Sequence, residues 1–522
     1  MGAVFKHPCD EGVVLSARVS EPPVAAARPW ILAVTVLGSS LAFVDGSVVN
    51  VALPALQREL GASVAGVQWV VEAYALFLSA LLLLGGSMAD RFGRRRVYAG
   101  GIVLFAAASA TCGLAGSVRA LVVARAAQGA GAALLVPGSL ALISASFPAG
   151  ERGRAIGTWS GFSAIATAFG PVLGGWLIEH RSWRWAFFMN LPVAVAVLAL
   201  LFRHVPESRD REATGQLDWP GAALVTVGLG GIVYGLLESS HLGWADPRVI
   251  WALTAGGGAL VAFGSVEARN HSPMVPLGLF RSRTFTGANV ITLLLYGALG
   301  GVFFFLPLDL IQVQRYSATG AGAAGLPFIV ILFVLSRWSG GLVDRFGARL
   351  PLVVGPVIAA AGLALLALPG TGGSYWSAFF PAMVVLGLGM AVSIAPLTTT
   401  VMNAVDVRHA GIASGINNAV SRAAGLLAVA LMGVLVVRVF EAEVDRRIAT
   451  LSLAPEVVAA FAAERVKLAG AEAPPDASAA DRRAIREAVA GAFVAGFRWT
   501  VLVAAGLALA SAASAALMID GP

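Results

Sequence analysis

The residue that most clearly suggests chemistry is an acid inside an apolar run. The stretch Phe43 to Pro54, FVDGSVVNVALP, places Asp45 and Asn50 within an apolar segment that extends from about Trp30 to Leu53. If this segment crosses a membrane, a carboxylate within it costs several kcal/mol unless it is paired, hydrated or protonated. An acid at a helix end would simply reach water, but Asp45 is far from both ends of the run. We therefore interpret Asp45 as a candidate proton-coupling group.

Two further charged residues, Glu72 and Arg125, lie inside later apolar runs. At a rise of ~1.5 Å per residue, Asp45 is roughly 13 Å below the outer end of its run, and Glu72 and Arg125 are each roughly 9 Å below theirs. The three side chains are therefore expected at one level. Two acids with one arginine hold a net charge near zero when one proton is bound, and substrate entry or water exclusion would shift their proton affinity.

Alternatives stay open for two of these residues. Glu72 is either a second acid or cation contact, or a water-facing acid at a cavity mouth. Arg125 could extend its side chain to the membrane surface, but Gln128 lies on the same helical face at i+3, which favours a functional pair.

Composition places the chain in a membrane. Of its 522 residues 58% are hydrophobic and 12% are charged, and the mean hydropathy is +0.81, whereas a soluble domain carries about 25% charged residues. The apolar runs are roughly 18–25 residues long, the length of a membrane-spanning helix. About fourteen spans are predicted: 30–53, 66–85, 97–115, 119–146, 155–178, 186–203, 219–237, 249–268, 285–306, 322–339, 350–369, 377–400, 411–437 and 491–518.

Arginine predicts the orientation, because loops on the cytoplasmic side of a membrane are enriched in positive charge. The net charge of +7 is almost wholly due to Arg, and sixteen loop arginines fall on one side against six on the other. The richer set is Arg91, Arg94, Arg95, Arg96, Arg152, Arg154, Arg203, Arg209, Arg211, Arg269, Arg281, Arg283, Arg337, Arg345, Arg349 and Arg408. The richer side and both termini are therefore predicted to be cytoplasmic, in a multi-pass protein of the cell membrane.

An internal repeat supports two equivalent halves. GSMADRFGRR (Gly86 to Arg95) recurs as GGLVDRFGAR (Gly340 to Arg349), a shift of 344 − 90 = 254 residues between Asp90 and Asp344. Each copy follows the second span of a six-span set if the spans 219–237 and 249–268 are an inserted pair. The predicted division is then a cytoplasmic tail (1–29), a first six-helix bundle (30–204), an inserted helix pair (205–270), a second six-helix bundle (271–518) and a cytoplasmic end (519–522).

One connection within the second bundle is long. Residues 438–490 mix alanine with many charged residues, and the topology places them outside the cell. We expect a solvated helical hairpin or cap that is broken at Pro474-Pro475. A role in capturing substrate is the less favoured interpretation.

The repeated loop resembles a known signature. Glycine permits a tight turn between spans, and an acid at the start of the following helix, the place predicted for Asp90, is favoured by the helix dipole. Together these residues fit the cytoplasmic loop motif of the major facilitator superfamily, in which such a cluster acts as a gate during alternating access. The resemblance implies gating roles for Gly86, Asp90, Arg91, Gly93, Arg94 and Arg95, and for Asp344 and Arg345 in the second copy. Topology and tight packing alone are the alternative.

The fifth predicted span carries the most specific pattern, GFSAIATAFGPVLGG. It resembles the motif that marks antiporters of this superfamily, with Gly161, Gly170, Pro171, Gly174 and Gly175 at the family's spacing. Small residues let helices approach closely, and proline disrupts the helical hydrogen bonds and favours a bend. A generic packing face would not require the whole pattern, so the antiporter interpretation is favoured.

The stretch from Arg125 to Ala133 resembles the second motif of the same superfamily. The opening stretch and three later ones are similar to the 14-helix drug:proton antiporters, the EmrB/QacA type. Their pattern Leu-Asp-x-Thr-Ile-Val-Asn-x-Ala-Leu-Pro is matched at Asp45, Val49, Asn50, Ala52, Leu53 and Pro54, with Val44, Ser47 and Val48 as mild changes. Further matching landmarks are Trp69 with Tyr74, WRWAFFMNLP (Trp183 to Pro192) and AGIASGINN (Ala410 to Asn418). The resemblance implies an all-α polytopic membrane protein of the major facilitator fold, with two six-helix bundles plus an inserted helix pair.

The function that this implies is proton-coupled export of drugs or antibiotics by alternating access. A dedicated exporter of one natural product or lipid is an alternative, and an uptake symporter of the same fold is less favoured. Expected substrates are small, lipophilic and often cationic. No cofactor, metal cluster, nucleic acid partner or enzymatic site is expected: the chain has no phosphate-binding Gly-Lys-Ser/Thr loop, and its six histidines lie outside or at the ends of spans.

The second half lacks counterparts to the acid and arginine of the first. A shift of 254 residues puts Leu299 opposite Asp45, and Asp309 is expected to form an ion pair with Arg315 at the rim. The second half would then supply mainly apolar walls, with Tyr296, Phe303, Phe304, Phe305 and Trp338 as possible contacts, although core packing is the favoured role for most of them. Substrate-cavity candidates are Asn50, Trp69, Tyr74, Gln128, Tyr296 and Phe303.

Overall fold

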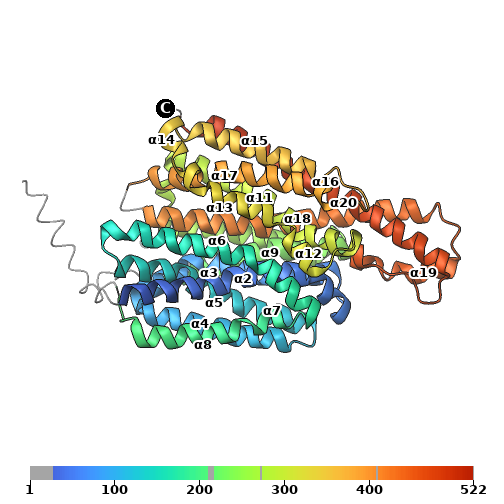
Figure 1. Cartoon of the computed structure of the whole chain (residues 1–522), viewed down its shortest axis with the longest axis horizontal. Helices are drawn as coiled ribbons and strands as arrows, with labels where there is room; N and C mark the ends of the chain where they lie inside the picture. The colour runs from blue at the N-terminus through green and yellow to red at the C-terminus, as the bar shows by residue number, and fades with distance from the viewer. Residues whose placement is uncertain (1–26, 210–216, 271–272, 407–409, 521–522) are drawn as a thin grey trace, which may run out of the picture.

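In the computed structural model the chain is a long bundle of helices (Figure 1). The structure describes residues 27–209, 217–270, 273–406 and 410–520; the predicted tail 1–29 therefore lies almost wholly outside it. Thirteen helices are long and apolar enough to cross a membrane, and a shorter apolar helix spans Arg349–Leu365. No strand occurs among the described residues. The all-α prediction of about fourteen spans is confirmed.

The first half consists of α2 to α8, in which α5 is central. It packs against α3 and α4, while α2 packs against α5, α6 and α8. The bounds are α2 Arg28–Leu60, α3 Val64–Phe92, α4 Arg94–Leu114, α5 Val118–Ser146, α6 Ala149–His180, α7 Trp185–Phe188 and α8 Asn190–His204. Because α2 continues to Leu60, Asp45 lies near the middle of a 33-residue helix rather than in its outer part.

The second half repeats this packing with broken helices. In the first half α2 packs on α6, α3 on α5 and α4 on α5; here α11 packs on α18, α13 on α17 and α15 on α17. The counterpart of α3 is divided into three pieces, α12, α13 and α14, with breaks at Ala324–Gly325 and at Gly341. The bounds are η2 Leu277–Arg281, α11 Arg283–Leu308, η3 Asp309–Val313, α12 Ala318–Ala323, α13 Leu326–Gly340, α14 Leu342–Phe346, α15 Arg349–Leu365, α16 Tyr375–Ala378 and α17 Phe380–Asn403.

Each of the repeated loops has a glycine with a positive φ at the equivalent position. Gly93 and Gly347, which are 347 − 93 = 254 residues apart, have φ angles of 105° and 70°, values that side chains other than glycine rarely adopt. Gly86 has a different place from the one predicted, since it lies inside α3 and makes no turn. Only Gly93 supplies the turn between α3 and α4.

The inserted helices α9 (Trp219–Leu242) and α10 (Pro247–Arg269) pack on each other. Helix α9 also packs on α3 of the first half and α18 of the second. The pair therefore covers a seam between the halves.

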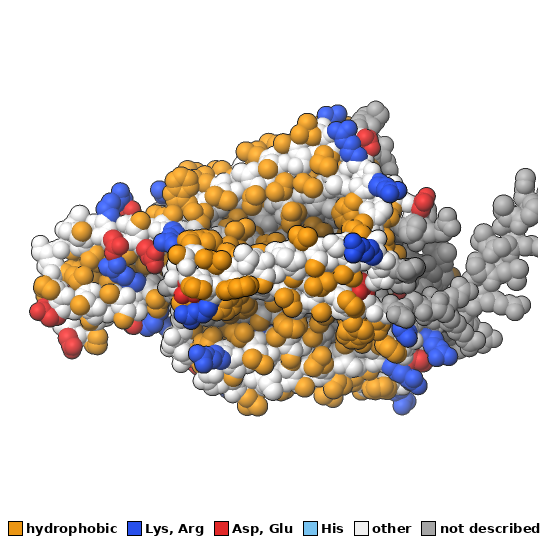
Figure 2. Space-filling view, turned by 180° about the vertical axis from the view of Figure 1, so that it is seen from behind, with side chains coloured by type: hydrophobic (Ala, Val, Ile, Leu, Met, Phe, Trp, Pro, Cys, Tyr) orange, Lys and Arg blue, Asp and Glu red, His pale blue; other side chains and the backbone are white. Residues whose placement is uncertain are grey.

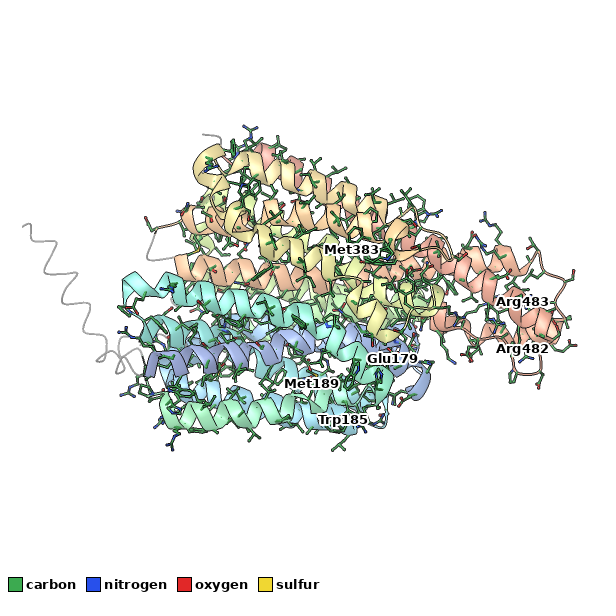
Figure 3. All side chains as sticks on the ribbon, in the orientation of Figure 1. Glu179, Trp185, Met189, Met383, Arg482 and Arg483 are labelled. Atoms are coloured by element: carbon green, nitrogen blue, oxygen red, sulfur yellow. The ribbon has the colours of Figure 1, made fainter. Side chains whose placement is uncertain are left out.

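Residues 438–490 form a helical projection, which we name the cap. It contains the end of α18 (Ala410–Ile448), α19 (Pro455–Ala462), η5 (Arg465–Gly470) and the start of α20 (Ala479–Met518). The chain is non-helical at Pro474-Pro475, as predicted. The cap extends from one end of the bundle, opposite the end where the C-terminus lies (Figure 1), and Arg482 and Arg483 are at its tip side (Figure 3).

Apolar side chains dominate the flanks of the bundle (Figure 2), while charged side chains gather at its ends and on the cap. Large apolar residues are openly exposed on these flanks, such as Trp251 at 73% and Val123 at 71%. Such exposure suits hydrocarbon rather than water. The bundle is therefore built to lie in a membrane with the cap outside the hydrocarbon layer.

Candidate functional site

Asp45 forms an ion pair with Arg125 in the interior of the first half. Asp45 is 0% exposed and Arg125 is 1% exposed, and the Arg125 guanidinium donates to Asp45 Oδ2. The two residues come from α2 and α5, the helices that the central packing of this half brings together. Full burial excludes extension of Arg125 to the membrane surface.

Amide and hydroxyl groups complete the network around the carboxylate. Gln128 Nε2 donates to Asp45 Oδ1 at 2.8 Å, and Asn190 Nδ2 donates to the same oxygen at 3.0 Å. Both amides also donate to Ser109 Oγ, at 2.7 and 2.9 Å. Ser109 and Asn190 are contributors that sequence reasoning missed, although Asn190 lies within a quoted landmark.

Arg125 links this network to a third helix, α3. Its Nε donates to the Val70 carbonyl oxygen at 3.0 Å, and its guanidinium carbon lies 4.2 Å from the centre of the Tyr74 ring. The Tyr74 hydroxyl in turn donates to the Ala42 carbonyl oxygen of α2 at 2.9 Å. One arginine thus joins α2, α3 and α5, so a change in the charge of Asp45 would be felt by all three helices.

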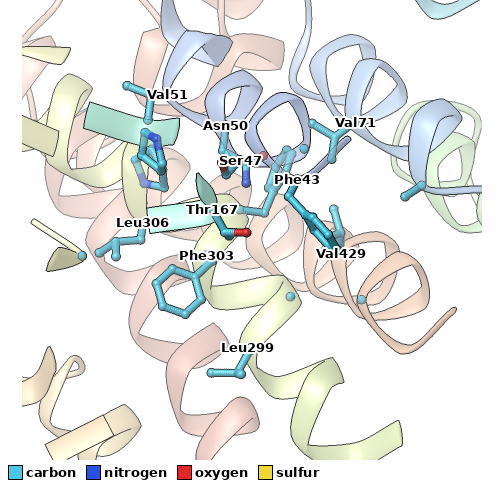
Figure 4. Close-up of a pocket in the computed structure, with 18 of the residues that line it drawn as sticks. Phe43, Ser47, Asn50, Val51, Val71, Thr167, Leu299, Phe303, Leu306 and Val429 are labelled. Carbon is cyan, nitrogen blue, oxygen red and sulfur yellow. The ribbon is translucent and has the colours of Figure 1, made fainter. Parts of the chain in front are cut away.

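A cavity of about 520 Å³ lies beside this pair (Figure 4). Its wall is mostly apolar, and both halves contribute to it. The first half supplies Phe43, Ser47, Asn50 and Thr167, and the second supplies Leu299, Phe303 and Leu306 (Figure 4). Arg125 reaches the cavity wall, whereas Asp45 lies behind it. A lipophilic molecule of drug size fits such a cavity.

Glu72 is at the cavity wall without a partner. It is 1% exposed, and neither carboxylate oxygen has a hydrogen-bond partner among the described residues. Asn50 Oδ1 is also buried without a partner at this wall. Arg125 pairs with Asp45, and it makes no ion pair with Glu72 in this conformation.

The second half contributes a charge that sequence reasoning missed. Arg422 of α18 lines the cavity, and its guanidinium carbon lies 5.9 Å from the centre of the Phe43 ring. The expectation of mainly apolar walls from this half is corrected accordingly. The signal in the sequence was an arginine twelve residues into the apolar α18. A count of the arginines in loops does not include it.

Several other expected contacts are placed elsewhere. Trp69 does not line the cavity but packs against Tyr234 of the inserted pair, with ring centres 6.2 Å apart. Gln128 belongs to the Asp45 network rather than to the cavity wall. Asn50, Tyr74, Tyr296, Phe303 and Phe304 do line the cavity.

The remaining candidates of the second half are also outside the cavity wall. Phe305 is fully buried in the core, and Trp338 is 55% exposed on the flank. Asp309 makes no ion pair with Arg315; it is 2% exposed and accepts a hydrogen bond from Gln314 Nε2 at 3.2 Å. The rim ion pair was wrong because the chain turns through η3 here and buries the acid.

In the loop between α3 and α4, Asp90 lies in the last turns of α3 and accepts from Arg94 Nε and Nη2 at 3.0 and 2.8 Å. It is Glu207, after α8, that caps the start of α4, by accepting from the backbone N–H groups of Arg95 and Arg96 at 3.0 and 3.2 Å. The predicted capping position of Asp90 is therefore wrong. In the second copy Arg345 is exposed, and the side chain of Asp344 lies outside the described residues.

The small residues of α6 contact both halves. A Cβ on Gly174 would lie 2.6 Å from a Val48 side-chain carbon of α2, and one on Gly175 would collide with the Ala318 carbonyl of α12. Gly170 faces Ser47 in the same close way. Gly161 has open space around it, so it has no close helix approach in this conformation. Pro171 lines the cavity.

Hydrogen bonds join the two halves at the cap end. Gln312 Nε2 donates to Gln57 Oε1 at 2.8 Å, and Gln57 Nε2 donates to the Lys467 carbonyl of the cap at 3.4 Å. Thr319 Oγ1 donates to Glu179 Oε2 at 2.6 Å, and Glu179 lies near the cap end of the bundle (Figure 3). These hydrogen bonds hold the two halves together at the cap end in this conformation.

A membrane bundle of two repeated halves with a cavity between them defines a transporter. A comparison with family models agrees: residues 35–429 match the Major Facilitator Superfamily, and the chain belongs to this family.

Relatives extend the likeness along the chain. It is 35% identical over 500 residues to the tetracenomycin C resistance and export protein of Streptomyces glaucescens, covering 94% of this chain and 91% of that protein. It is 40% identical over 410 residues to the puromycin resistance protein pur8 of Streptomyces alboniger, covering 78% and 81%. The multidrug resistance protein Stp of Mycobacterium tuberculosis (strain CDC 1551 / Oshkosh) is 36% identical over 408 residues, covering 77% and 74%.

Among solved structures, a bacterial homolog of the human lysosomal transporter Spinster has the same fold. It superposes with a TM-score of 0.65 at 18% identity, covering 96% of this chain and 100% of that chain.

Proposed function

We propose that this protein is a drug:proton antiporter that exports small lipophilic molecules across the cell membrane by alternating access. The observation that carries the proposal is the Asp45–Arg125 pair buried at the wall of a cavity between two halves. Relatives named for resistance and export support the direction of transport. The excess of arginine in loops opposite the cap supports cytoplasmic termini and an external cap.

In the proposed mechanism Asp45 is the principal proton carrier. When Asp45 binds a proton, the attraction between Asp45 and Arg125 weakens. The contacts through which Arg125 joins α2, α3 and α5 then weaken together. Because Arg125 reaches the cavity wall while Asp45 lies behind it, a bound molecule and the proton act on the same arginine. This arrangement supports the exchange of a bound substrate for a proton.

Glu72 is proposed as a second acid or a contact for cationic substrates. A buried carboxylate without donors is costly when charged, so it is stabilised either by a proton or by a cation in the cavity. Its two unpartnered oxygens support both roles. The loops at Asp90 and Arg345 are proposed to gate the cytoplasmic side, and the small residues of α6 to limit leakage.

The test is expression in a host that lacks its own efflux pumps, with a panel of compounds screened for efflux that an uncoupler abolishes. Uptake of the same compounds instead of efflux would reverse the proposed direction. Efflux of one compound alone from a chemically broad panel would favour a dedicated exporter of a natural product or lipid.

For Glu72, the variant Glu72→Gln separates its two roles. We expect efflux of the cation ethidium to fall at least about fivefold, because a hydrogen-bonded or ion-paired charge is worth more than ~1 kcal/mol. Efflux of an uncharged compound should stay within about twofold. An equal loss for both would make Glu72 part of proton coupling instead. Glu487→Gln, an exposed acid on the cap part of α20, is the matched control.

A further inference from the structure

Arg422 and Arg125 both line the cavity, but they differ in the partners that surround the guanidinium group. Arg125 has a carboxylate, an amide oxygen, a backbone carbonyl and an aromatic ring around its guanidinium. Arg422 has no carboxylate within ion-pair distance and no hydrogen-bond acceptor among the described residues; its neighbours are the Phe43 ring and the side chains of Tyr74 and Tyr296. A charged side chain inside a membrane protein is costly unless it is paired. Arg422 is therefore a cation at the cavity wall that forms no ion pair with the described residues.

Glu72 also lines the cavity, but it forms no ion pair with Arg422. Helices α3 and α18 run antiparallel, since Gln68 Nε2 donates to the Val429 carbonyl at 3.2 Å while Gly415 faces Leu83. The paired residue numbers sum to 497 and 498, which places Glu72 opposite residue 425 or 426. Arg422 is then about one helical turn, roughly 5 Å along the axis, closer to the end opposite the cap. The acid and the cation stand at different heights of the cavity.

We propose that Arg422 is a binding subsite for an anionic group of the transported molecule, so that the cavity accepts lipophilic acids. The planar guanidinium suits the flat pair of oxygens of a carboxylate, and it also binds sulfonates. Tyr296 and Phe303 offer the apolar body of such a molecule a wall beside the charge. The inference rests on the proposed exporter function, and it widens the expected substrates beyond neutral and cationic compounds.

The test compares two probes that share a skeleton. One is 1-anilinonaphthalene-8-sulfonate, and the other is N-phenyl-1-naphthylamine, which lacks the sulfonate. Each is equilibrated by dialysis with the purified full-length protein in phosphatidylcholine nanodiscs, against empty nanodiscs as the blank. We expect Arg422→Gln to weaken sulfonate binding about tenfold or more, because hydrogen bonds to charged groups are the stronger ones. Binding of the neutral probe should change by less than about twofold.

Two further variants control the test. Arg422→Lys keeps the charge and loses the planar fork, so its affinity for the sulfonate should lie between those of wild type and Arg422→Gln. Arg438→Gln removes an exposed arginine from the same helix, sixteen residues away, and should leave both probes unchanged. Equal weakening of both probes, or no weakening of the sulfonate, would overturn the subsite.

Binding is measured without a proton gradient, which separates this inference from the exporter function. If efflux in cells proved insensitive to uncouplers while the sulfonate still required Arg422, the antiporter proposal would fail alone. If Arg422→Gln failed to assemble, Arg422→Lys would decide: sulfonate binding unchanged from wild type, or equal weakening of both probes, would overturn the subsite.

Discussion

The two halves share a backbone plan but treat charge differently. In the first half Asp45 and Arg125 satisfy each other inside a network of amides and hydroxyls. In the second half Arg422 faces the cavity and has no acceptor in the part of the chain that the structure describes, and Asp309 is buried away from the cavity wall. The two halves therefore share their helix packing, but the second half does not repeat the buried ion pair of the first. A closed network suits a group that must hold a proton until it is displaced, and an open charge suits a group that awaits a ligand.

The sharpest way to break this contrast is to neutralise one buried acid in each half. Asp45→Asn should reduce uncoupler-sensitive efflux at least about tenfold, because the amide is nearly the same shape but binds no proton at this site. Efflux is measured in cells with equal amounts of wild-type and variant protein in the membrane. Asp309→Asn should keep most of the activity, since Asp309 is outside the cavity wall. Equal losses from the two variants would show that proton coupling is not confined to the first half.

The second comparison concerns the two arginines and stability. Arg125→Met leaves the Asp45 carboxylate buried without its cation, which should cost about 3–5 kcal/mol of folding free energy. Arg422→Met removes a charge without a partner and should leave the melting temperature unchanged or raise it. Thermal unfolding of the purified variants in detergent measures both. Combining Arg125→Met with Asp45→Asn should recover part of the loss, and a double variant less stable than Arg125→Met would argue against the ion pair.

A third comparison tests where the halves touch. Gly175→Ala puts a methyl group against the Ala318 carbonyl across the interface, and such overpacking typically costs about 1–3 kcal/mol. We expect slower transport, by several-fold, in proteoliposomes. Gly161→Ala is the matched control in the same helix, because its added methyl meets open space. If both variants behaved alike, the small residues of α6 would matter for the helix itself rather than for the contact between halves.

The smallest expected effect concerns the hydrogen bonds that join the two halves at the cap end. Gln57→Ala removes the acceptor for Gln312 and the donor to the Lys467 carbonyl, and each such bond contributes about 0.5–1.5 kcal/mol. Amide hydrogen exchange of η5 should therefore accelerate by up to about tenfold. Glu456→Gln, an exposed substitution in the first turn of α19, should leave exchange at η5 unaltered.

The sequence predicts the features that follow from composition and from the free-energy cost of a charge in an apolar span. Asp45 and Arg125 were predictable because charge inside an apolar run needs a reason, and the turn glycines were predictable because the loop recurs at a fixed spacing. Ser109 and Asn190 were not, since ordinary polar residues become partners only when α4 packs on α5 and α8 packs on α2.

Other outcomes depended on local geometry that residue types do not reveal. Glu207 displaced Asp90 as the cap of α4 because the segment after α8 folds back over that helix start. The tenth predicted span, 322–339, is interrupted at Ala324–Gly325, where a run of small residues gives no strong signal for a break. Arg422 lies inside a predicted span as Arg125 does, so the sequence carries the same signal for it although it was not predicted.

The cap has a mechanical consequence. Helices α18 and α20 contain 39 and 40 residues, so each is roughly 60 Å long, about twice the hydrocarbon thickness of a bilayer. A tilt of the second half by roughly 10° would displace a point roughly 45 Å from the membrane centre by roughly 8 Å. The cap therefore converts a small tilt of the second half into a displacement that is large enough to measure. A dye pair at Arg482 on the cap and Arg119 at the start of α5 would report the conformational cycle one molecule at a time, without touching the cavity.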